Sequence, residues 1–487
     1  MDRLKDTIDI PANVQVPGYQ REQHGIGIVH FGLGAFHRGH MAVYTDDVLA
    51  DKGGDWSIVG VSLRSPGARD RLLPQHCLYT LVERGVEGEK HRIIGSVKNV
   101  LVAPENPEAV LQQLCDPKVH IISFTITEKG YLRDAATGEL LRGHPDIQHD
   151  LVHPEQPRTM HGFITEALAR RKQAGFAPVT LLCCDNLPEN GVSLRKAVCG
   201  FARLRDQKLA DWIEASIAFP CTMVDRIVPA TTASDIEQTS LALGRYDAAP
   251  VICEPFCQWV IENNFSSPRP VWEAFGATLV QDVAPYEDMK LRLLNCSHSA
   301  MAYLGYLSGI ETIDQVIITP VFKNFVVQLM QEVLPTLDMP EGVDLQEYCA
   351  ALIERFRNPS LKHRTWQIAM DGSQKIPQRI LSTIRALKAA GKPYTCLAMS
   401  VAGWLRYVTA IDEHGNSIEV SDPMAEQLCR IAEQNKDNLQ NYVQEIVKMA
   451  DIFGPDLASD AAFQDTIHNC LQTIYDLGAQ GAVGSLL

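Results

Sequence analysis

The amino-terminal part of the chain alternates short apolar runs with amphipathic stretches. Apolar runs bounded by turn-forming residues predict buried strands, and they occur at residues 25–34, 57–63, 119–127 and 179–186. Helical spacing of apolar positions predicts helices between them, at residues 41–50, 107–115 and 161–173. Strands that are apolar on both faces are typical of a parallel sheet with helices on each side. The pattern therefore predicts an α/β fold with a doubly wound sheet.

The pattern changes after residue 285, where long helical periods dominate and strand signals become rare. Helices are predicted at residues 321–337 and 422–434, among others. A chain of 487 residues is also longer than one hydrophobic core usually supports. We therefore predict two domains: an α/β dinucleotide-binding domain at residues 1–284, and a mainly α-helical substrate-binding domain at residues 285–487.

Composition narrows the class of partner. The chain is 46% hydrophobic and 21% charged, as folded proteins are, and its net charge is −15. Nucleic acids and anionic membranes need a positive surface, so neither is expected as a partner. No apolar run reaches the length of a membrane span, and the first 20 residues lack the apolar core of a signal peptide. We expect a cytoplasmic protein with a small-molecule ligand, and a monomer, since no exposed apolar helix stands out.

The 13 cysteines lie mostly in apolar runs, where free cysteine behaves as a small hydrophobe. Cys253 and Cys257 form a CxxxC pair that His37 and His40 would have to complete around a metal ion. Zinc sites usually repeat a tighter pair of ligands at fixed spacing, which this sequence does not offer. We therefore predict no metal site.

A glycine-rich segment, FGLGAFHRGH at residues 31–40, follows the first predicted strand. In a dinucleotide site, Gly32 would permit the tight turn and Gly34 would let the backbone approach a pyrophosphate at a helix N-terminus. Ala35 and Phe36 follow directly and are predicted to contact the cofactor with them. A turn with only a structural role is the alternative, but the position at a strand-to-helix junction favours the dinucleotide.

The end of the second predicted strand bears on the choice of cofactor. An acidic residue usually binds the ribose hydroxyls of NAD there, but the chain has Arg64, Ser65 and Pro66. Arg64 could stack on adenine, hold the 2′-phosphate of NADP, or simply be exposed. We expect NAD as the cofactor and leave NADP open.

A second unusual segment, KLRLLNCSHS at residues 290–299, places polar residues inside an apolar helical pattern. On an ideal helix, with about 100° per residue, Lys290, Asn295, His298 and the preceding Glu287 share an arc of roughly 140°. A solvent-facing polar stripe would carry more Glu, Lys and Gln than this segment has. Burial lowers the pKa of a lysine ammonium, and such a lysine can act as a general base. With a nicotinamide, the cluster suggests metal-independent oxidation of a secondary alcohol.

Five blocks of the sequence follow one another over nearly the whole chain: GLGAFHRGH, TEKGY, CDNLPENG, FPCTMVDRIVP and KLRLLNCSHS. Together, and in this order, they resemble the polyol-specific long-chain dehydrogenases, the mannitol dehydrogenase family. The resemblance implies a Rossmann-type amino-terminal domain followed by a mainly helical domain. The predicted helix that contains Lys290, at residues 290–299, is called the lysine helix. We expect it at the start of the second domain rather than deep in either core.

The resemblance also implies roles for single residues. Lys290 would be the general base, Asn186 and Asn295 would donate to the reacting oxygen, and His298 would hold the substrate. Asp225 would shape the substrate site, and Glu287 would line a proton path. Simpler explanations stay open for three of them: Asn186 as a helix cap, Asp225 in an ion pair with Arg226, and Glu287 as an acid favoured by the helix dipole.

The choice of substrate depends on residues 363–379, which resemble fructuronate reductases and carry Arg364, Lys375 and Arg379. These side chains are predicted to bind the substrate, where they could hold a uronate carboxylate. A structural turn at the DGS sequence is the alternative, and residues 60–72 resemble the mannitol branch more. We predict an NAD(P)-dependent oxidoreductase of the D-mannonate/D-fructuronate kind. A mannitol, arabinitol or sorbitol dehydrogenase is the runner-up, and a non-catalytic dinucleotide-binding sensor is the alternative of another class.

Overall fold

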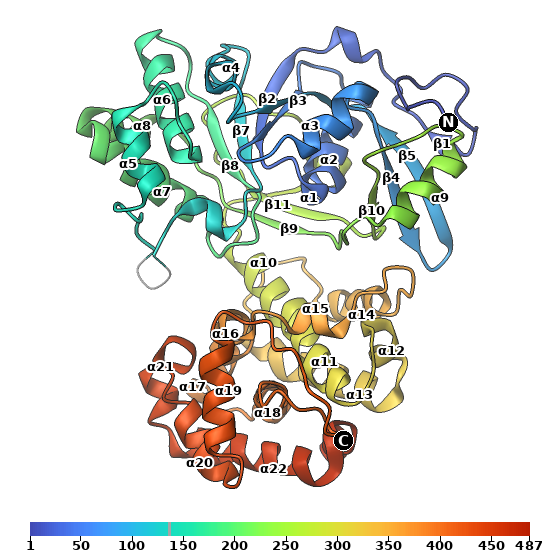
Figure 1. Ribbon diagram of the computed structural model, residues 1–487, viewed down its shortest axis with the longest axis vertical. Coiled ribbons are helices and arrows are strands. Elements are labelled where there is room, and N and C mark those ends of the chain that lie inside the picture. Colours follow the sequence, from blue (N-terminus) through green and yellow to red (C-terminus); the bar gives the residue numbers. More distant parts are fainter. Residues whose placement is uncertain (135–137) are drawn as a thin grey trace. The chain divides into compact units, whose positions relative to one another are not determined.

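The computed structural model describes residues 1–134 and 138–487 of the chain. It divides into two compact units, Met1–Ala284 and Pro285–Leu487 (Figure 1). The hydrophobic clusters of each unit are formed by buried residues of that unit alone.

The first unit is built on a five-stranded parallel sheet. Its strands are β2 (Ile26–Phe31), β3 (Ser57–Ser62), β6 (Val97–Val102), β7 (Ile121–Phe124) and β8 (Thr180–Cys183). In the sheet they follow the order β6-β3-β2-β7-β8. Numbered within this sheet alone, that is the order 3-2-1-4-5 of doubly wound nucleotide-binding folds, with the switch point between β2 and β7. The predicted fold class is confirmed.

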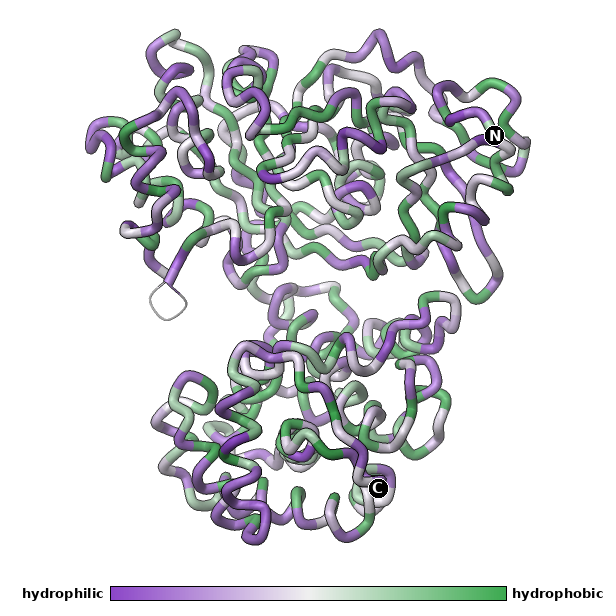
Figure 2. The backbone as a smooth tube through the Cα atoms, viewed as in Figure 1, coloured by the Kyte–Doolittle hydropathy of each residue, from purple (hydrophilic) through white to green (hydrophobic). Residues whose placement is uncertain are grey.

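Successive residues of these strands point to opposite faces, so each strand contributes to two cores. Val29 and Phe31 join one cluster, together with α4 (Pro107–Leu114), α6 (Met160–Gln173) and α7 (Asn190–Arg205). Ile28 joins the other cluster, which includes α2 (Met41–Asp51). In Figure 2 the strands are mainly hydrophobic, whereas the surrounding helices carry hydrophilic stretches. The strands lack a polar face because both of their faces pack against buried hydrophobic residues.

Two smaller sheets accompany the main one, and the sequence pattern did not predict them. One has the order β1-β5-β4-β10, and the other the order β12-β11-β9. Their strands are β1 (Val14–Gln15), β4 (Tyr79–Gly85), β5 (Gly88–Ile94), β9 (Thr222–Asp225), β10 (Val251–Cys253), β11 (Gln258–Glu262) and β12 (Thr278–Val280). The β4–β5 hairpin escaped prediction because its tip is charged and exposed, and the other strands are short.

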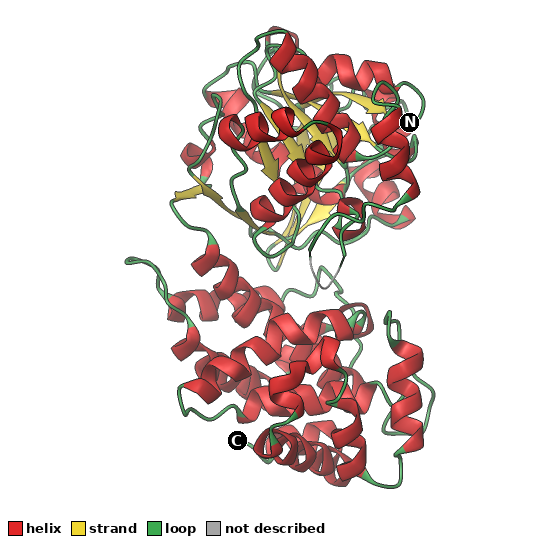
Figure 3. Cartoon of the chain, turned by 90° about the vertical axis from the view of Figure 1, so that its left-hand side faces the viewer, coloured by secondary structure: helices red, strands yellow, loops and turns green. Residues whose placement is uncertain are grey.

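The second unit is helical, as Figure 3 shows. Residues 285–487 are all described, and apart from two isolated bridges they form no strand. Helix α13 (Pro320–Val333) ends earlier than predicted and passes into the 3-10 turn Leu334–Thr336. Pro335 explains this, because proline cannot donate the backbone hydrogen bond that would continue an α-helix.

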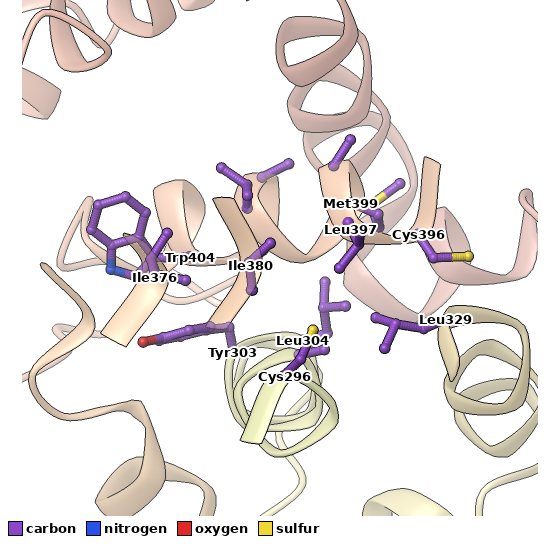
Figure 4. Close-up of a cluster of buried hydrophobic side chains, with 14 of the residues drawn as sticks. Cys296, Tyr303, Leu304, Leu329, Ile376, Ile380, Cys396, Leu397, Met399 and Trp404 are labelled. Carbon is purple, nitrogen blue, oxygen red and sulfur yellow. The ribbon is translucent and has the colours of Figure 1, made fainter. Parts of the chain in front are cut away.

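Helix α11 (Cys296–Leu307) lies in the core of the second unit, in contact with α13, α18 (Thr395–Tyr407) and α22 (Ala461–Gly484). Figure 4 shows side chains of α11 packed against those of neighbouring helices: Cys296, Tyr303, Leu304, Leu329, Ile380 and Leu397 among others. The expectation that the lysine helix avoids both cores is therefore wrong for α11. Buried hydrophobic residues of the neighbouring helices pack against α11. Burial of the apolar residues of α11 against them stabilises the fold.

Candidate active site

The glycine-rich turn lies at the carboxyl end of β2, beside the switch point of the sheet. Gly32 has a φ of +90°, and a Cβ atom at this position would lie 2.1 Å from the carbonyl oxygen of Thr125. Only glycine fits there. Gly34 is exposed with an ordinary φ of −84°, and its nearest neighbour to a Cβ atom would be 3.8 Å away. The space above Gly34 is thus open to a ligand, as a dinucleotide site needs.

The helix predicted at residues 41–50 is confirmed as α2, which begins at Met41. A short helix that the sequence did not predict, α1 (Ala35–Gly39), precedes it, with a break at His40. Ala35 and Phe36 are half-buried in α1, and Arg64 is exposed just after β3. These three residues thus follow the carboxyl ends of neighbouring strands, where ligands of doubly wound sheets bind.

A hydrogen-bonded network of side chains, which the sequence pattern did not predict, contacts the backbone of the glycine-rich turn. His30 is bonded through Nδ1 to Ser123 Oγ and through Nε2 to Thr125 Oγ1, both at 2.8 Å. The hydroxyl of Thr125 donates to the carbonyl of Gly32 at 2.8 Å, so it accepts from Nε2–H of His30. Burial lowers the pKa of His30 to about 3, so the ring is neutral near pH 7 and carries its proton on Nε2. The ring of His37 stacks on it at 3.4 Å between centroids.

Asn186 is exposed in the loop after β8, at the same carboxyl edge of the sheet. The next helix, α7, has Glu189 rather than Asn186 at its N-cap, so capping does not account for Asn186. The preceding residue, Asp185, is buried and accepts from the backbone N–H groups of Ile126 and Thr127. The loops after β7 and β8 are thus joined by hydrogen bonds.

Asp225 is buried at the end of β9, opposite Gln258 of β11. The neighbouring Arg226 donates to the carbonyl oxygens of Gly39 and Glu254 and to the carboxylate of Glu83. Arg226 therefore joins the end of α1 to the smaller sheets. These bonds give Arg226 a structural role of its own.

The lysine helix is not one regular α-helix, which corrects the assumed 100° per residue. Helix α10 (Ala284–Met289) passes into a π-helical segment, Lys290–Asn295, and then into α11. The N–H of Cys296 donates to the carbonyl of Leu291, five residues earlier. With about 4.4 residues per turn, residues five apart in a π-helix are offset by about 50° around the axis, compared with about 140° in an α-helix. Lys290 and Asn295 therefore share one side of the segment more closely than an α-helix would allow.

Three residues of this segment and its continuation are buried: Lys290, Asn295 and His298 are 7–9% exposed. The ring of His298 lies 4.8 Å from that of Phe356 and 5.4 Å from that of His363. Burial, together with the nearby basic groups, keeps the pKa of His298 well below its ordinary value. His298 is thus neutral near pH 7. Glu287 is half-buried in the first turn of α10.

The basic groups next to His298 include two of the three residues predicted to bind a carboxylate, Lys375 and Arg379. Lys375 donates to the carbonyls of Ile368 and Met370, at the end of helix α15 (Thr365–Ala369), and burial lowers its pKa to about 8. Arg364 is exposed at the N-cap of the same helix.

Arg379 belongs to a second π-helical segment, Pro377–Leu381. Its Nη1 atom donates to Ser299 Oγ at 3.1 Å and to the carbonyl of Asn295 at 3.4 Å. The two π-helical segments are therefore in contact, and Arg379 links them. Widened turns of this kind occur often at functional sites.

Comparison with known proteins identifies the family. A model of the mannitol dehydrogenase Rossmann domain matches residues 26–274, and one of the mannitol dehydrogenase C-terminal domain matches residues 282–475. The chain belongs to the mannitol dehydrogenase family. The resemblance inferred from the sequence blocks is confirmed.

Three relatives of this family carry two different named activities. D-mannonate oxidoreductase of Escherichia coli is 45% identical, with 98% of this chain and 99% of that protein covered. Mannitol 2-dehydrogenase of Aspergillus terreus is 43% identical, with 95% and 93% covered. The solved structure of Pseudomonas fluorescens mannitol 2-dehydrogenase, a ternary complex with NAD and D-mannitol, has 38% identity and a TM-score of 0.88, with 100% and 99% covered. Overall similarity therefore does not decide between sugar acid and polyol.

Metal ligands and membrane-spanning helices were also sought in the structure. Among the residues that the structure describes, no group of three or more His, Cys, Asp or Glu side chains is placed to hold a metal ion. Within the same residues, no helix is both long and apolar enough to cross a bilayer.

Proposed function

We propose that this chain is an NAD-dependent oxidoreductase that interconverts a secondary alcohol and a ketone on a sugar acid, with Lys290 as the general acid/base. The observation that carries this proposal is the π-helical segment in which Lys290 and Asn295, both buried, share one side. Membership of a family whose named relatives are dehydrogenases and oxidoreductases supports it.

The proposed cofactor site is the turn at Gly32 and Gly34 with Ala35 and Phe36, beside the switch point of the sheet. The space next to Gly34, where even an added Cβ atom would have no neighbour closer than 3.8 Å, supports a close approach of a pyrophosphate to the backbone. A nicotinamide, when bound, supplies the hydride acceptor. The bound NAD of the solved relative supports this choice. Arg64 stands where NAD sites usually carry an acid, so NADP stays an option for the same site.

In the proposed reaction, Lys290 takes the hydroxyl proton of the alcohol as the carbon gives up hydride. The amide groups of Asn186 and Asn295 donate to the oxygen as negative charge develops there. Neutral His298 orients the substrate and Lys290, Asp225 shapes the site, and Glu287 passes the proton to solvent. In the reverse direction the lysine ammonium protonates the ketone oxygen. Lysine supplies the acid/base chemistry, so the proposed reaction is metal-independent.

The proposed substrate is D-mannonate, with D-fructuronate as its ketone. Cationic side chains beside His298 support an anionic substrate: Lys375, Arg379 and Arg355. The 45% identity to D-mannonate oxidoreductase agrees with this choice. The runner-up is a mannitol-type polyol, which the solved relative with bound D-mannitol favours. We further propose that the protein is cytoplasmic and that it is a monomer. Light scattering after size-exclusion chromatography measures the molar mass and so tests the monomer.

The test is a spectrophotometric screen of fructuronate, tagaturonate, fructose and xylulose, with NADH and NADPH measured separately. We expect fructuronate with NADH to be reduced fastest. Lys290→Ala should lower kcat by about 10²–10⁴-fold, the usual contribution of general acid–base catalysis. Lys323→Ala removes an exposed lysine of α13 and serves as the control.

Each alternative outcome has a distinct meaning. Turnover of neutral ketoses alone would replace the sugar acid by a polyol–ketose pair. Unchanged turnover in Lys290→Ala would refute the catalytic role of the lysine. Tight NADH binding by the wild-type protein without turnover of any ketone would favour the dinucleotide-binding sensor.

A further inference from the structure

The backbone of Thr127 has a conformation that normally requires glycine. Its φ is +65° and its ψ is +163°. For a residue with a Cβ atom, especially a β-branched one, this conformation is strained and persists only where the surroundings enforce it. Such strain is concentrated at functional sites. The question is what holds Thr127 in place.

The carboxylate of Asp185 holds it. The N–H of Thr127 donates to Oδ1 at 2.9 Å, while the N–H of Ile126 and the hydroxyl of Tyr131 donate to Oδ2 at 3.1 and 2.7 Å. Asp185 is itself fixed, because Asn190 donates from Nδ2 to the carbonyls of Asp185 and Thr222. Asn190 thus links the backbone of Asp185 to that of β9.

Thr127 lies at the switch point of the sheet. It follows β7 by three residues, and β7 is the neighbour of β2. Thr125, two residues earlier, donates to the carbonyl of Gly32 and thus contacts the glycine-rich turn. Thr127 is exposed at this edge, whereas Asp185 is buried. Asp185 can therefore act on a bound ligand through the loop that it holds.

In doubly wound sheets the dinucleotide crosses the switch point, and the adenosine half lies over the first two strands. The loops after β7 and β8 then border the nicotinamide half. We propose that Asp185 is a positioning residue, which keeps Thr127 in its strained conformation so that the loop after β7 fits the nicotinamide half of the cofactor. This inference rests on the proposed function.

The substitution Asp185→Asn tests the restraint at almost constant volume. An amide replaces one acceptor oxygen by a donor, which then faces the N–H of Thr127 or of Ile126. We expect Thr127 to relax to an ordinary conformation, and the Kd for NADH to rise by about tenfold, the size of effect that backbone strain supports. The KM for the sugar substrate should change less.

Asp150 offers a matched control in the same unit. It is buried in helix α5 (Pro145–Val152) and also accepts from two backbone N–H groups, those of Arg158 and Thr159, and from the hydroxyl of Thr159. We expect Asp150→Asn to lower Tm without changing the Kd for NADH. An effect of Asp185→Asn on Tm alone, like that of the control, would overturn the proposal.

Thr127→Gly distinguishes positioning from a merely structural role. Glycine adopts the native φ and ψ without strain, so Thr127→Gly in the Asp185→Asn background should restore most of the lost NADH affinity. No recovery in the double variant would refute the restraint of Thr127 as the function of Asp185. If Asp185→Asn does not fold, Tyr131→Phe weakens the same carboxylate network and should raise the Kd by a smaller factor; an unchanged Kd would then count against the proposal.

Titration of the wild-type protein with NADH and NADPH separates the two levels of inference. Absence of binding to both would refute the proposed function, and the role of Asp185 with it. Binding by the wild type together with an unchanged Kd in Asp185→Asn would refute only the role of Asp185.

Discussion

The guanidinium of Arg379 donates from Nη1 to the main-chain oxygen of Asn295, over a distance of 3.4 Å. Both residues belong to π-helical segments, in which the regular i→i−4 hydrogen bonds of an α-helix are interrupted. Arg379 thus supplies a donor to a carbonyl at the end of the lysine segment, and a second one to Ser299. This contact indicates that Arg379 positions Asn295, in addition to any direct contact with substrate.

Substitution of Arg379 separates these two roles. If Arg379 positions Asn295, Arg379→Met should lower kcat by about ten- to a hundredfold for acidic and neutral substrates alike, since small displacements of catalytic groups have effects of this size. Steady-state kinetics with fructuronate and fructose check this. A rise in KM for fructuronate alone would instead make Arg379 a carboxylate ligand. Arg385→Met, which removes an ion pair with Asp456, is the control.

Two glycines of the same turn should respond differently to alanine. Gly32→Ala places a Cβ atom against the carbonyl of Thr125 at a positive φ and should destabilise the protein by on the order of 3 kcal/mol. Gly34→Ala has room in the fold, so the free energy of unfolding should change little, while the Kd for NADH rises by roughly tenfold. Urea unfolding and NADH titration check both. Unchanged NADH binding in Gly34→Ala would contradict the placement of the pyrophosphate.

The pKa of Lys375 predicts a pH dependence of substrate binding. Burial lowers this pKa from 10.5 to about 8, so the ammonium is present below pH 8 and is lost above it. If the ammonium binds a carboxylate, the KM for fructuronate should be constant from pH 6.5 to 7.5 and should rise above about pH 8. The KM for a neutral ketose should stay flat. In Lys375→Arg the rise should disappear, because arginine stays charged over this range. A flat profile for fructuronate would exclude Lys375 as its ligand.

Buried neutral histidines predict a loss of stability in acid. Burial lowers the pKa of His30 to about 3, and of His161 and His363 to about 4. In the unfolded chain these groups titrate near 6.5, so the unfolded state binds more protons between the two values. The free energy of unfolding should therefore fall as the pH decreases from about 6.5 to 4. Urea midpoints at a series of pH values measure this, and a midpoint independent of pH would contradict it.

The histidine contribution can be tested at one site. His161→Gln keeps a polar side chain of similar reach to the carbonyl of Tyr131, to which His161 Nε2 is bonded. Glutamine does not titrate, so the slope of stability against pH should decrease in this variant. An unchanged slope would assign the acid sensitivity to other groups.

Local pattern was sufficient for much of the fold. The strands at β2, β3, β7 and β8 could be predicted because burial on both faces makes them apolar throughout. The β4–β5 hairpin could not, because its stability depends on pairing with β10 and β1 rather than on its own charged sequence. The candidate residues Lys290, Asn295 and His298 were recognisable as polar groups in an apolar helix. Asp185 was not, because the backbone N–H groups that donate to it belong to the loop after β7, which is distant in sequence.

By itself, the sequence determined the two-part organisation, the parallel sheet, the glycine turn and the polar residues of the lysine segment. Each of these follows from hydrophobic periodicity or from the chemistry of single residues, which are local properties. The tertiary structure alone decided the π-helical form of Lys290–Asn295, the bond from Arg379 to Asn295, and the restraint of Thr127 by Asp185. These features depend on contacts between residues far apart in the chain. The spacing of hydrophobic residues along the sequence does not reveal such contacts.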